Sequence, residues 1–537
     1  MSEAVENIQS EESGNLPLSW VRARLCEIAA INPTLDKSEI EDDLLVSFVP
    51  MPAVEAETGR IDVSTHRRFA EVKKGYTGFL EGDVLFAKIT PCMENGKMAV
   101  VPALKNDLGF GSTEFHVLRP ADSISPDYLY YFVSSKAFRI VAERNMTGAV
   151  GQRRVPTTFL NDSEIPLPSA AEQQRIVIKL DELFSELDKG VENLRTAQQQ
   201  LKVYRQALLK HAFEGKLTAD WRAQNPDKLE SAEALLERIH QEREARYQRQ
   251  LAEWKEAKQA WEANGKTGSK PTKPKEPKAL PTLTVEELTE LSELPDGWIY
   301  VKAEAISDFI TKGTTPGKEL LFDGAGEIPF IKVYNLTKTG ALDFTISPTF
   351  VSRDTHNGFL ARSKVYPGDV LMNIVGPPLG KVSIVPATYP EWNINQAIAI
   401  YRSELIQSKL LAAFLSSEIN VRRMMSKSKA TAGQFNLTLE ICRDAIIPLC
   451  GAKEQEQLSR ALDEKLSNLD QLEKTIADSL QQAESLRQSI LKKAFSGQLV
   501  PQNPDDEPAS VLLERIRSER SAQQPARKRG RKTAKPS

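Results

Sequence analysis

An internal repeat constrains this 537-residue chain more than any other feature. When the sequence is shifted by 282 positions, residues 165–217 align without a gap to residues 447–499, and 22 of the 53 residue pairs are identical. The identical positions include the phrases Ile-Pro-Leu, Leu-Asp-Glu and Leu-Asp, an Arg-Gln pair and a terminal Ala-Phe pair. A repeat at a fixed distance indicates the architecture of a chain before any local pattern does. The sequence therefore predicts a duplicated half-molecule.

A second kind of segment precedes each repeat, and the two copies agree in plan but not in detail. One copy opens at LPLSW and the other at LPDGW. Each contains a GDVL phrase, GDVLFAKITP at 82–91 and GDVLMNIVGP at 368–377, and each closes near a Gly-Gln pair, within 147–156 and 431–438. The plan is therefore a variable module, a constant segment, a second variable module and a second constant segment.

Both constant segments have the apolar spacing of a coiled coil. Apolar residues recur at steps of three and four, and each segment ends at a glycine, Gly215 or Gly497, that suits the left-handed position after a helix. Each seam could pack on its own module, but two related narrow seams pack most simply on each other, antiparallel because a module intervenes. The predicted seam residues are Ile176, Leu180, Leu183, Leu187, Val191, Leu194, Leu201, Tyr204 and Leu208, and Leu458, Leu462, Leu469, Ile476, Leu480, Leu486 and Ile490.

The variable modules have the pattern of mixed α/β domains. Short runs rich in Val, Ile and Phe between Gly and Pro predict strands, and residues 125–141 and 403–425 predict helices. The fold class is α+β, with two α/β modules separated by two long antiparallel coiled-coil helices in a pseudo-twofold repeat. The predicted strands lie at 44–49, 84–89, 115–118, 328–333, 370–374, 382–385 and 398–401.

The predicted segments follow one another along the whole chain. They are a disordered acidic N-terminus (1–15), the first module (16–165), the first constant helix (166–217), a charged helical region (218–263), a Lys/Pro-rich linker (264–293), the second module (294–447), the second constant helix (448–499), and a C-terminal helix with a basic tail (500–537). Within the charged region, residues 228–263 predict a helix that is either solvated or continues the coil.

Composition excludes several classes of protein. No window approaches the roughly 18–20 consecutive apolar residues of a membrane span, and the acidic start is the opposite of a secretory signal or a transit peptide. The four cysteines are too few and too scattered for a disulfide framework, and none forms a CxxC pair. We therefore expect a cytoplasmic protein.

No catalytic motif in the sequence is complete. The Gly-Lys-Thr at 265–267 imitates the end of a P-loop, but Ala260 stands where the leading glycine should be, and no strand precedes it. The five histidines lack metal-ligand spacing, and no Asn/Asp-Pro-Pro-aromatic motif of an amino-methyltransferase is present. Separate Pro-Asp and Glu-x-Lys sequences resemble fragments of a nuclease motif. They lie on or beside a predicted charged helix, where such residues occur through composition alone. We expect no catalytic, cofactor or metal site in the chain and no enzymatic activity of the chain alone.

Polar and basic residues recur instead on loops beside the predicted strands of both modules. Lys and Arg neutralise phosphate or reach guanine, Asn and Gln can pair with the edge of adenine, and Ser and Thr serve either. For any one of these residues, a place in an ordinary solvated loop remains the simpler interpretation. Only the recurrence of such residues in both modules favours a role in DNA binding. The candidate DNA-binding residues are Lys88, Thr90, Asn95, Lys97, Ser112, Thr113, Gln152, Arg153 and Arg154 in the first module, and Lys332, Asn335, Asn373, Lys381, Asn395, Gln396, Gln434 and Asn436 in the second.

On the basis of these sequence motifs, the whole chain closely resembles the specificity subunit of type I restriction-modification systems. The resemblance rests on the two-module plan, on GDVLFAKITPCMENGK and GDVLMNIVGPPLGK, on the Gly-Gln phrases, and on IPLP…EQQRI and IPLC…EQEQL with the AFEGKL and AFSGQL helix ends. It implies that 16–165 and 294–447 are target recognition domains for the two halves of a bipartite, asymmetric DNA site. The constant helices would then set the spacing and dock two modification subunits.

The resemblance also implies which partners and cofactors lie outside this chain. Modification subunits would bind S-adenosylmethionine and methylate adenine, and translocating restriction subunits would hydrolyse ATP with Mg²⁺ and cleave DNA. The net charge of −3 fits a DNA reader whose partners hold much of the phosphate backbone. Two other classes stay open: a coiled-coil scaffold linking two protein-binding domains, and a self-sufficient restriction enzyme, which the missing methyltransferase motif opposes.

Overall fold

The computed structural model describes residues 16–149, 151–277, 279–337, 340–376, 378–404, 406–428, 430–431 and 434–523. The predicted acidic segment 1–15 and the basic residues after 523 lie outside the described residues. By its internal contacts the chain divides into two units, residues 1–194 with 478–537 and residues 195–477. None of the helices in the described part of the chain is long and apolar enough to cross a membrane.

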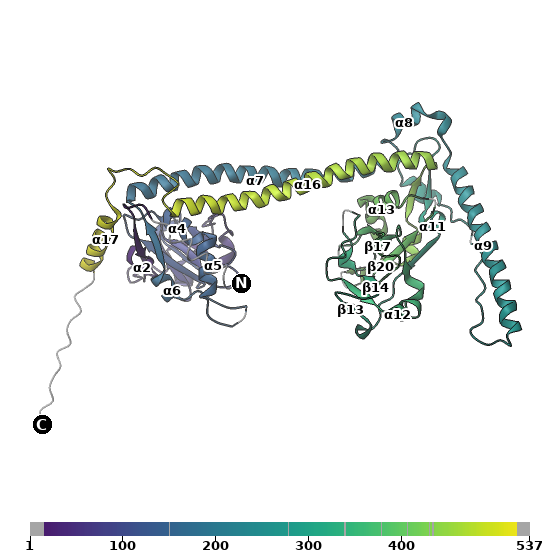
Figure 1. Cartoon of the computed structure of the whole chain (residues 1–537). Coiled ribbons are helices and arrows are strands. Elements are labelled where there is room, and N and C mark those ends of the chain that lie inside the picture. The colour runs from purple at the N-terminus through teal and green to yellow at the C-terminus, as the bar shows by residue number, and fades with distance from the viewer. Residues whose placement is uncertain are drawn as a thin grey trace, which may run out of the picture. The chain divides into compact units, whose positions relative to one another are not determined.

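The two constant segments form helices α7 (Ala170–Phe213) and α16 (Ala452–Phe495), each of 44 residues, and each contributes one half to each unit. Within each unit the two helices lie side by side and run in opposite directions (Figure 1). Their buried apolar residues pack on the partner helix and on the module of the same unit, in one core for the first unit and another for the second. Gly215 and Gly497 have φ of +69° and +73°, which confirms their predicted left-handed conformation after each helix.

Two of the predicted seam residues are wrong, and both for the same reason. Tyr204 and Leu486 are 52% and 51% exposed. The neighbouring Arg205 and Arg487 turn inward instead and form ion pairs across the seam with Asp470 of α16 and Asp188 of α7, respectively. Counting apolar residues cannot locate such a seam position, because an arginine occupies it. The carboxylate on the facing helix neutralises the charge of that arginine.

The first module contains two four-stranded sheets. Strand β3 pairs in parallel with β8, and the other neighbours are antiparallel. A separate pair, β1 (Val21–Arg24) with β10 (Glu164–Leu167), joins the two ends of the module. The first sheet has the order β2 (Ala29–Ile31), β9 (Phe115–Pro120), β6 (Val84–Ala87), β7 (Met98–Val100), and the second has the order β4 (His66–Arg68), β3 (Leu45–Val49), β8 (Gly109–Gly111), β5 (Thr77–Phe79).

The second module repeats this plan with different strands. Strand β14 pairs in parallel with β19, and β11 (Ile299–Lys302) pairs with β23 (Ile446–Leu449) at the ends of the module. Its first sheet has the order β12 (Phe309–Lys312), β20 (Ile398–Arg402), β17 (Val370–Asn373), β18 (Val382–Ile384). Its second has the order β13 (Phe322–Asp323), β15 (Thr349–Val351), β14 (Ile328–Ile331), β19 (Trp392–Ile394), β16 (Lys364–Val365).

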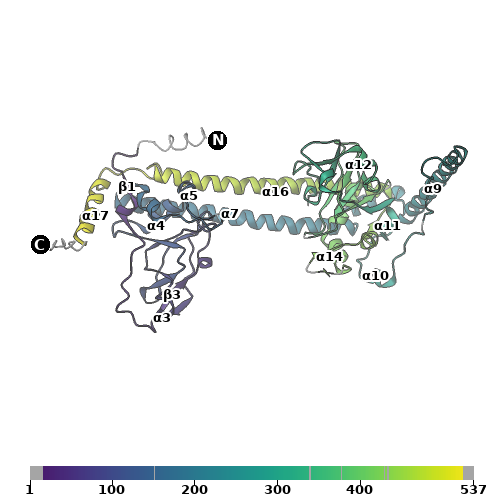
Figure 2. The ribbon, with the colours of Figure 1, turned by 90° about the horizontal axis from the view of Figure 1, so that it is seen from below.

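Every predicted strand is confirmed at nearly its predicted bounds, but each predicted module helix is two helices. Residues 125–141 form α4 (Pro126–Ser134) and α5 (Lys136–Arg144), and 403–425 form α13 (Ser408–Ser416) and α14 (Glu418–Ser426). Ser135 and Ser417 interrupt the helices, and each side-chain hydroxyl caps the helix that follows. Figure 2 shows α4 and α5 against the two long helices. The remaining short helices of the modules are α2 (Leu25–Ile28), α3 (Phe69–Val72), α6 (Thr157–Asp162), α11 (Ala303–Ile306), α12 (Arg353–Asn357) and α15 (Leu439–Arg443).

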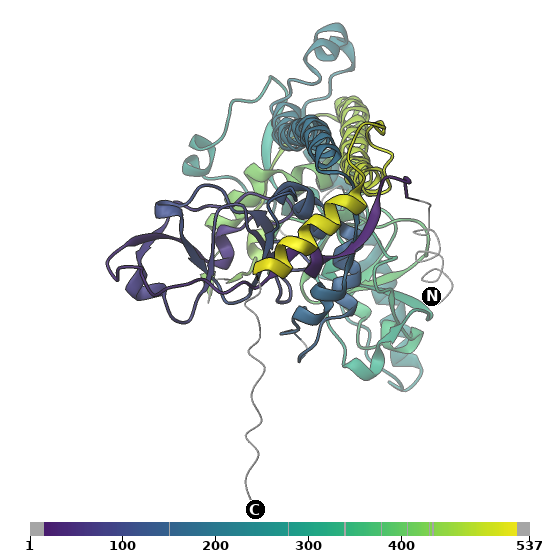
Figure 3. The same cartoon turned by 90° about the vertical axis from the view of Figure 1, so that its left-hand side faces the viewer.

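The chain after each long helix docks on the module of the other repeat. After α16, helix α17 (Ala509–Gln523) crosses β1 of the first module (Figure 3), with the Ala509 N–H donating to the Ser19 carbonyl at 3.0 Å. After α7, helix α9 (Ala232–Ala263) begins against the second module, with the Ala232 N–H donating to the Gly297 carbonyl at 3.0 Å. The repeated LLERI phrase therefore buries Leu512 and Leu235 in equivalent places.

The charged region 218–263 neither continues the coil nor stands wholly in solvent. The chain turns after α7 through α8 (Ala219–Gln224), and α9 buries Leu235 and Ile239 against the second module. Further along α9, Arg243 and Arg246 bond the Glu304 carbonyl and the Asp308 carboxylate. The N-terminal part of α9 therefore packs on the second module, and the expectation that the 228–263 helix is either solvated or a continuation of the coil is corrected.

Candidate nucleic-acid interface

The Asp of each GDVL phrase is a structural residue that fixes the first sheet of its module. Asp83 is 1% exposed and accepts two hydrogen bonds of 2.7 Å from Arg119 on β9, and one of 2.8 Å from the Leu80 N–H. Asp369 repeats all three bonds, two from Arg402 and one from the Tyr366 N–H. Bidentate Arg–carboxylate pairs fix orientation as well as distance. The strands that carry the candidate loops are thereby held in one register.

At the opposite end of β6, three candidate loops of the first module meet. Ile89 and Arg154 form a β-bridge, the Val155 N–H donates to the Lys88 carbonyl at 2.9 Å, and the Lys88 N–H donates to the Glu114 carbonyl at 2.9 Å. Residues 88–97, 112–114, 147–149 and 151–154, which we call the first loop cluster, therefore form one surface although they are far apart in the sequence.

Two arginines of the first loop cluster are paired with acidic residues. Arg154 binds Glu114 through two hydrogen bonds of 2.9 and 2.8 Å, and this pairing lowers the pKa of the Glu114 carboxyl. Arg153 lies 3.5 Å from Glu143 and 3.9 Å from Glu94. Since both pairs are partly exposed, a phosphate or a base edge could compete for these guanidinium groups.

A polar hollow of about 320 Å³ opens beside the first loop cluster. His116 lines it, with its Nε2–H donating to the Val155 carbonyl at 2.8 Å while Nδ1 accepts a hydrogen bond from Asn32 at 2.9 Å. Burial lowers the pKa of His116, so this ring is neutral. Among the described residues no side chain bonds Lys88 Nζ or Thr113 Oγ1, which line the same hollow. These two donors are therefore available to an acceptor that enters it.

Three other candidates of the first module have structural bonds. Lys97 Nζ donates to the carbonyls of Val54 and Met51 at 2.6 and 3.3 Å, Thr90 Oγ1 donates to Glu94 at 2.8 Å, and Ser112 Oγ accepts from the Glu114 N–H at 3.2 Å. These bonds shape the loops. Asn95 and Gln152 are exposed on the same cluster, and no bond from their side chains occurs within the described residues.

The second module brings the equivalent loops together at the end of β17. Val375 and Asn436 form a β-bridge, the Leu437 N–H donates to the Ile374 carbonyl at 2.9 Å, and the Ile374 N–H donates to the Ala397 carbonyl at 2.8 Å. Residues 373–376, 378–381, 395–397 and 434–437 form what we call the second loop cluster. It has the same connections as the first, with Ile374 in the place of Lys88.

The amides of the second module divide into structural and exposed groups. Asn373 is buried and bonds the Lys381 N–H and the Pro378 carbonyl, and Asn335 is buried and bonds the carbonyls of Asp343 and Ile346. The structure gives both a role in shaping loops. The exposed or half-exposed candidates of this module are Lys332, Lys381, Asn395, Gln396 and Asn436, while the side chain of Gln434 lies outside the described residues.

The comparisons with known proteins agree over nearly the whole chain. Residues 17–194 match the family model described as "Type I restriction modification DNA specificity domain". The chain is 28% identical over 547 aligned positions to the type I restriction enzyme EcoEI specificity subunit of Escherichia coli, covering 91% of this chain and 84% of that one. The chain is therefore similar to type I restriction enzyme specificity subunits over most of its length, and residues 17–194 are similar to a type I DNA specificity domain.

Two further comparisons extend this result. The EcoAI specificity subunit of Escherichia coli is 41% identical over 182 residues, a match that spans 34% of this chain and about a third, 31%, of that protein. A solved structure from work entitled "Structural basis underlying complex assembly and conformational transition of the type I R-M system" has a TM-score of 0.63 at 20% identity, covering 90% of this chain and 100% of that chain, and therefore supports the fold.

Sequence reasoning missed the polar hollow of the first module. Asn32, Thr34, Thr77 and His116 line it together with Lys88 and Thr113, and they come from segments with no shared motif. One signal was available, because Asn32 stands before a proline and adopts φ of +52°, a left-handed conformation that Asn accepts more readily than most residues. The convergence of these side chains depends on strand pairing, which their spacing does not reveal.

Proposed function

We propose that each variable module of this specificity subunit reads one half of a bipartite, asymmetric DNA site through its loop cluster. The observation that carries the proposal is the convergence of loops at the end of β6 and again at the end of β17, by the same bridge and the same backbone hydrogen bonds. The side chains differ between the clusters, with Lys88 in one and Ile374 in the other at the same position. Equal frameworks with unequal side chains suit two unlike half-sites.

The chemistry of the free side chains supports different base preferences in the two modules. Lys88 and Thr113 offer donors to an acceptor-rich edge such as O6 and N7 of guanine. In the second loop cluster, Gln396 occupies the place of Thr113, just before the strand, and an amide can pair with the N6 and N7 of adenine. We therefore expect the first half-site to contain a guanine contact that depends on Lys88.

The long helices set the distance between the half-sites in this proposal. A helix such as α7, at a rise of ~1.5 Å per residue, is about 66 Å long. We expect the two half-sites to lie one or more turns of B-DNA apart, at ~34 Å per turn. Bases that lie between the half-sites would then go unread. The same helices dock two modification subunits, and restriction subunits join that complex.

The cofactors of the complex belong to its other subunits in this proposal. Modification subunits bind S-adenosylmethionine, and restriction subunits use ATP and Mg²⁺. Within the described residues no group of three or more His, Cys, Asp or Glu side chains could hold a metal ion. The specificity subunit contributes sequence reading and assembly.

Selection of binding sites from a random duplex library tests the proposal. The full chain, co-expressed with its modification subunit, should enrich one bipartite sequence with a fixed unread gap. Enrichment of no sequence would favour the scaffold alternative, and enrichment of one continuous site would contradict the two-module reading. Methylation of the library by the chain without its modification subunit would support the alternative that the chain is a self-sufficient restriction enzyme.

A further inference from the structure

Helices α4 and α13 are equivalent, and they can be compared residue by residue. Each has 9 residues, each ends at a serine that is followed by the cap of the next helix, and they are 282 positions apart, as are α7 and α16. Each lies against the long helices of its own unit. Differences between the two units along these helices are therefore differences in side chains on one common framework.

In the first unit aromatic side chains fill the space between α4 and the long helices. The Tyr131 and Phe184 rings are 5.6 Å apart between centroids, and Tyr130 lies 5.2 Å from Tyr131. The Arg487 guanidinium covers Phe184 at 4.3 Å. The Tyr131 hydroxyl donates a hydrogen bond to Asp181 on α7. Burial and this bond raise the pKa of Tyr131, so the phenol remains a donor.

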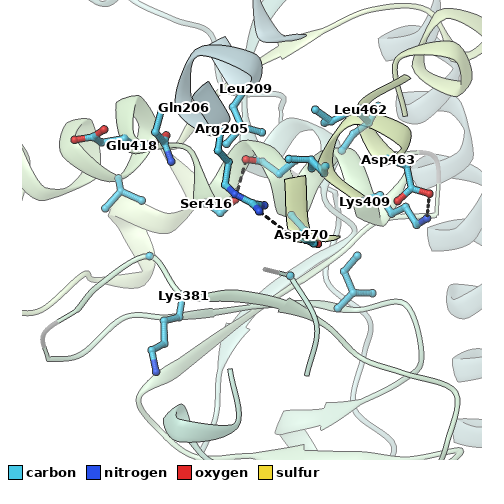
Figure 4. Close-up of a pocket in the computed structure, with 18 of the residues that line it drawn as sticks. Arg205, Gln206, Leu209, Lys381, Lys409, Ser416, Glu418, Leu462, Asp463 and Asp470 are labelled. Carbon is cyan, nitrogen blue, oxygen red and sulfur yellow. Dashed lines mark hydrogen bonds and ion pairs between the residues drawn. The ribbon is translucent and has the colours of Figure 1, made fainter. Parts of the chain in front are cut away.

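In the second unit small residues leave the equivalent space open. Ala412 and Ala413 replace the two tyrosines, and Leu466 replaces Phe184. A cavity of about 840 Å³ lies between α7, α13, α16 and the β17–β18 turn (Figure 4). Its size is within the range of roughly 300–1,000 Å³ that ligand-binding pockets have.

The cavity also retains the acceptor that Tyr131 uses in the first unit. Asp463 is the equivalent of Asp181, and its Oδ2 accepts a hydrogen bond of 2.7 Å from Lys409. Among the described residues nothing else bonds this carboxylate, whose side chain is 53% exposed. The Arg205–Asp470 ion pair belongs to the same lining (Figure 4). In the first unit Arg487, the equivalent of Arg205, covers Phe184. The lining of the cavity is mixed, with apolar side chains and with Glu418, Asp470 and Glu473 besides Asp463. Asp463 alone stands in the place of Asp181, so its carboxylate and the nearby apolar side chains match the two chemical parts of a phenol.

We propose that this cavity receives a tyrosine side chain from a modification subunit docked on α7 and α16, with its hydroxyl bonded to Asp463. The exposed Val203 and Lys409 belong to the lining, so the cavity opens to solvent on the helix surface. The first unit cannot offer the same site because its own Tyr131 and Phe184 occupy it. The inference rests on the proposed function and adds that the two docking faces are unequal.

The test compares a filled variant with an opened one. Ala413→Tyr with Leu466→Phe, the filled variant, places the aromatic pair of the first unit in the part of the cavity beside Asp463. Tyr131→Ala with Phe184→Leu, the opened variant, removes that pair from the first unit. Native mass spectrometry and titration should show that the wild-type chain binds two modification subunits with unequal affinity. The filled variant should bind one of them at least tenfold more weakly. The opened variant should retain both.

Two measurements separate this inference from misfolding and from failure of the proposed function. The tyrosine analogue p-cresol should raise the melting temperature of the wild-type chain and not that of the filled variant. Asp463→Ala should weaken the binding of the same single modification subunit without filling the cavity. Equal binding of both modification subunits by wild type and filled variant, or an equal p-cresol shift, would overturn the inference. If the wild-type chain binds no modification subunit at all, the proposed function itself fails.

Discussion

The indole N–H of Trp20 donates a hydrogen bond of 2.9 Å to the carboxylate of Glu172, in the first turn of α7. Trp298 makes the same bond, at 3.0 Å, to Glu454 in the first turn of α16. Burial raises the pKa of Glu172 even though Gln502, from the chain after α16, donates to its second oxygen. Each tryptophan thus joins the start of a module to the start of one long helix.

Replacing Trp20 with Phe should destabilise the first unit by about 1.5–3 kcal/mol, because a buried carboxylate loses one charge-assisted hydrogen bond. Trp298→Phe should have a similar effect on the second unit. Hydrogen exchange resolved along the chain can assign each loss to its unit. Leu18→Ala, at a fully exposed residue, is the control. If Trp20→Phe leaves exchange in the first unit unchanged, the bond to Glu172 does not hold this junction.

Lys88 and Lys97 lie in one loop cluster but should respond differently to replacement by Met. Lys88→Met should weaken binding to the preferred duplex by about 1–3 kcal/mol and relax one position of the first half-site, with little change in melting temperature. Lys97→Met removes hydrogen bonds to the Val54 and Met51 carbonyls, so it should lower the melting temperature. Binding titrations and thermal melts of both variants are needed. Loss of stability without loss of affinity in Lys88→Met would contradict its assignment as a reading residue.

Asp83→Ala should cost about 2–3 kcal/mol, since it leaves Arg119 and the Leu80 N–H without their shared acceptor. Asp369→Ala should cost a similar amount in the second module, where Arg402 makes the equivalent bonds. Denaturant unfolding measures both. The exposed Asp62, which bonds only the nearby Ser64, provides the matched control Asp62→Ala. A cost equal to that of the control would mean that the GDVL aspartates are not structural.

Much of the fold follows from sequence pattern because strands and repeats are local signals. Strands β3, β6 and β17 appear where Val, Ile and Phe gather between Gly and Pro, and the end of α7 follows from Gly215. The exposed Tyr204 could not be predicted in the same way. Arg205 occupies the seam position instead, because the facing Asp470 neutralises its charge.

The sequence indicated which loops carry recurring polar and basic residues, but not that these loops lie together. The segment that follows each Gly-Gln pair meets the end of the GDVL strand in both modules through a β-bridge, which no local pattern reveals. Buried Asn373 and exposed Gln396 have the same kind of side chain, and the difference between them arises from neighbouring loops that fold over one and not the other. His116 and Asn32 were missed because a strand pairing, that of β2 with β9, brings them together.

Stability of the first module should fall in acid because of His116. Burial holds the pKa of this imidazole below its ordinary value of about 6.5, so the folded state favours the neutral ring while the unfolded chain binds a proton. The stability present above about pH 6.5 is therefore lost as the pH falls from there through the lowered pKa. His116→Gln keeps a donor near the Val155 carbonyl but does not titrate. Melting temperatures at pH 7.5 and 5.5 should differ more for the wild type than for the variant, and equal differences would exclude His116 as the cause.

Exchange of one module tests the central claim most directly. Residues 294–447 are replaced by the second module of a related specificity subunit with a different target, and methylated adenines are mapped across the genome of a strain that carries the complete system. The account predicts that one half of the recognised sequence changes while the other half and the unread gap remain as in the wild type. A change in both halves, or an unchanged sequence, would contradict the assignment of one half-site to each module.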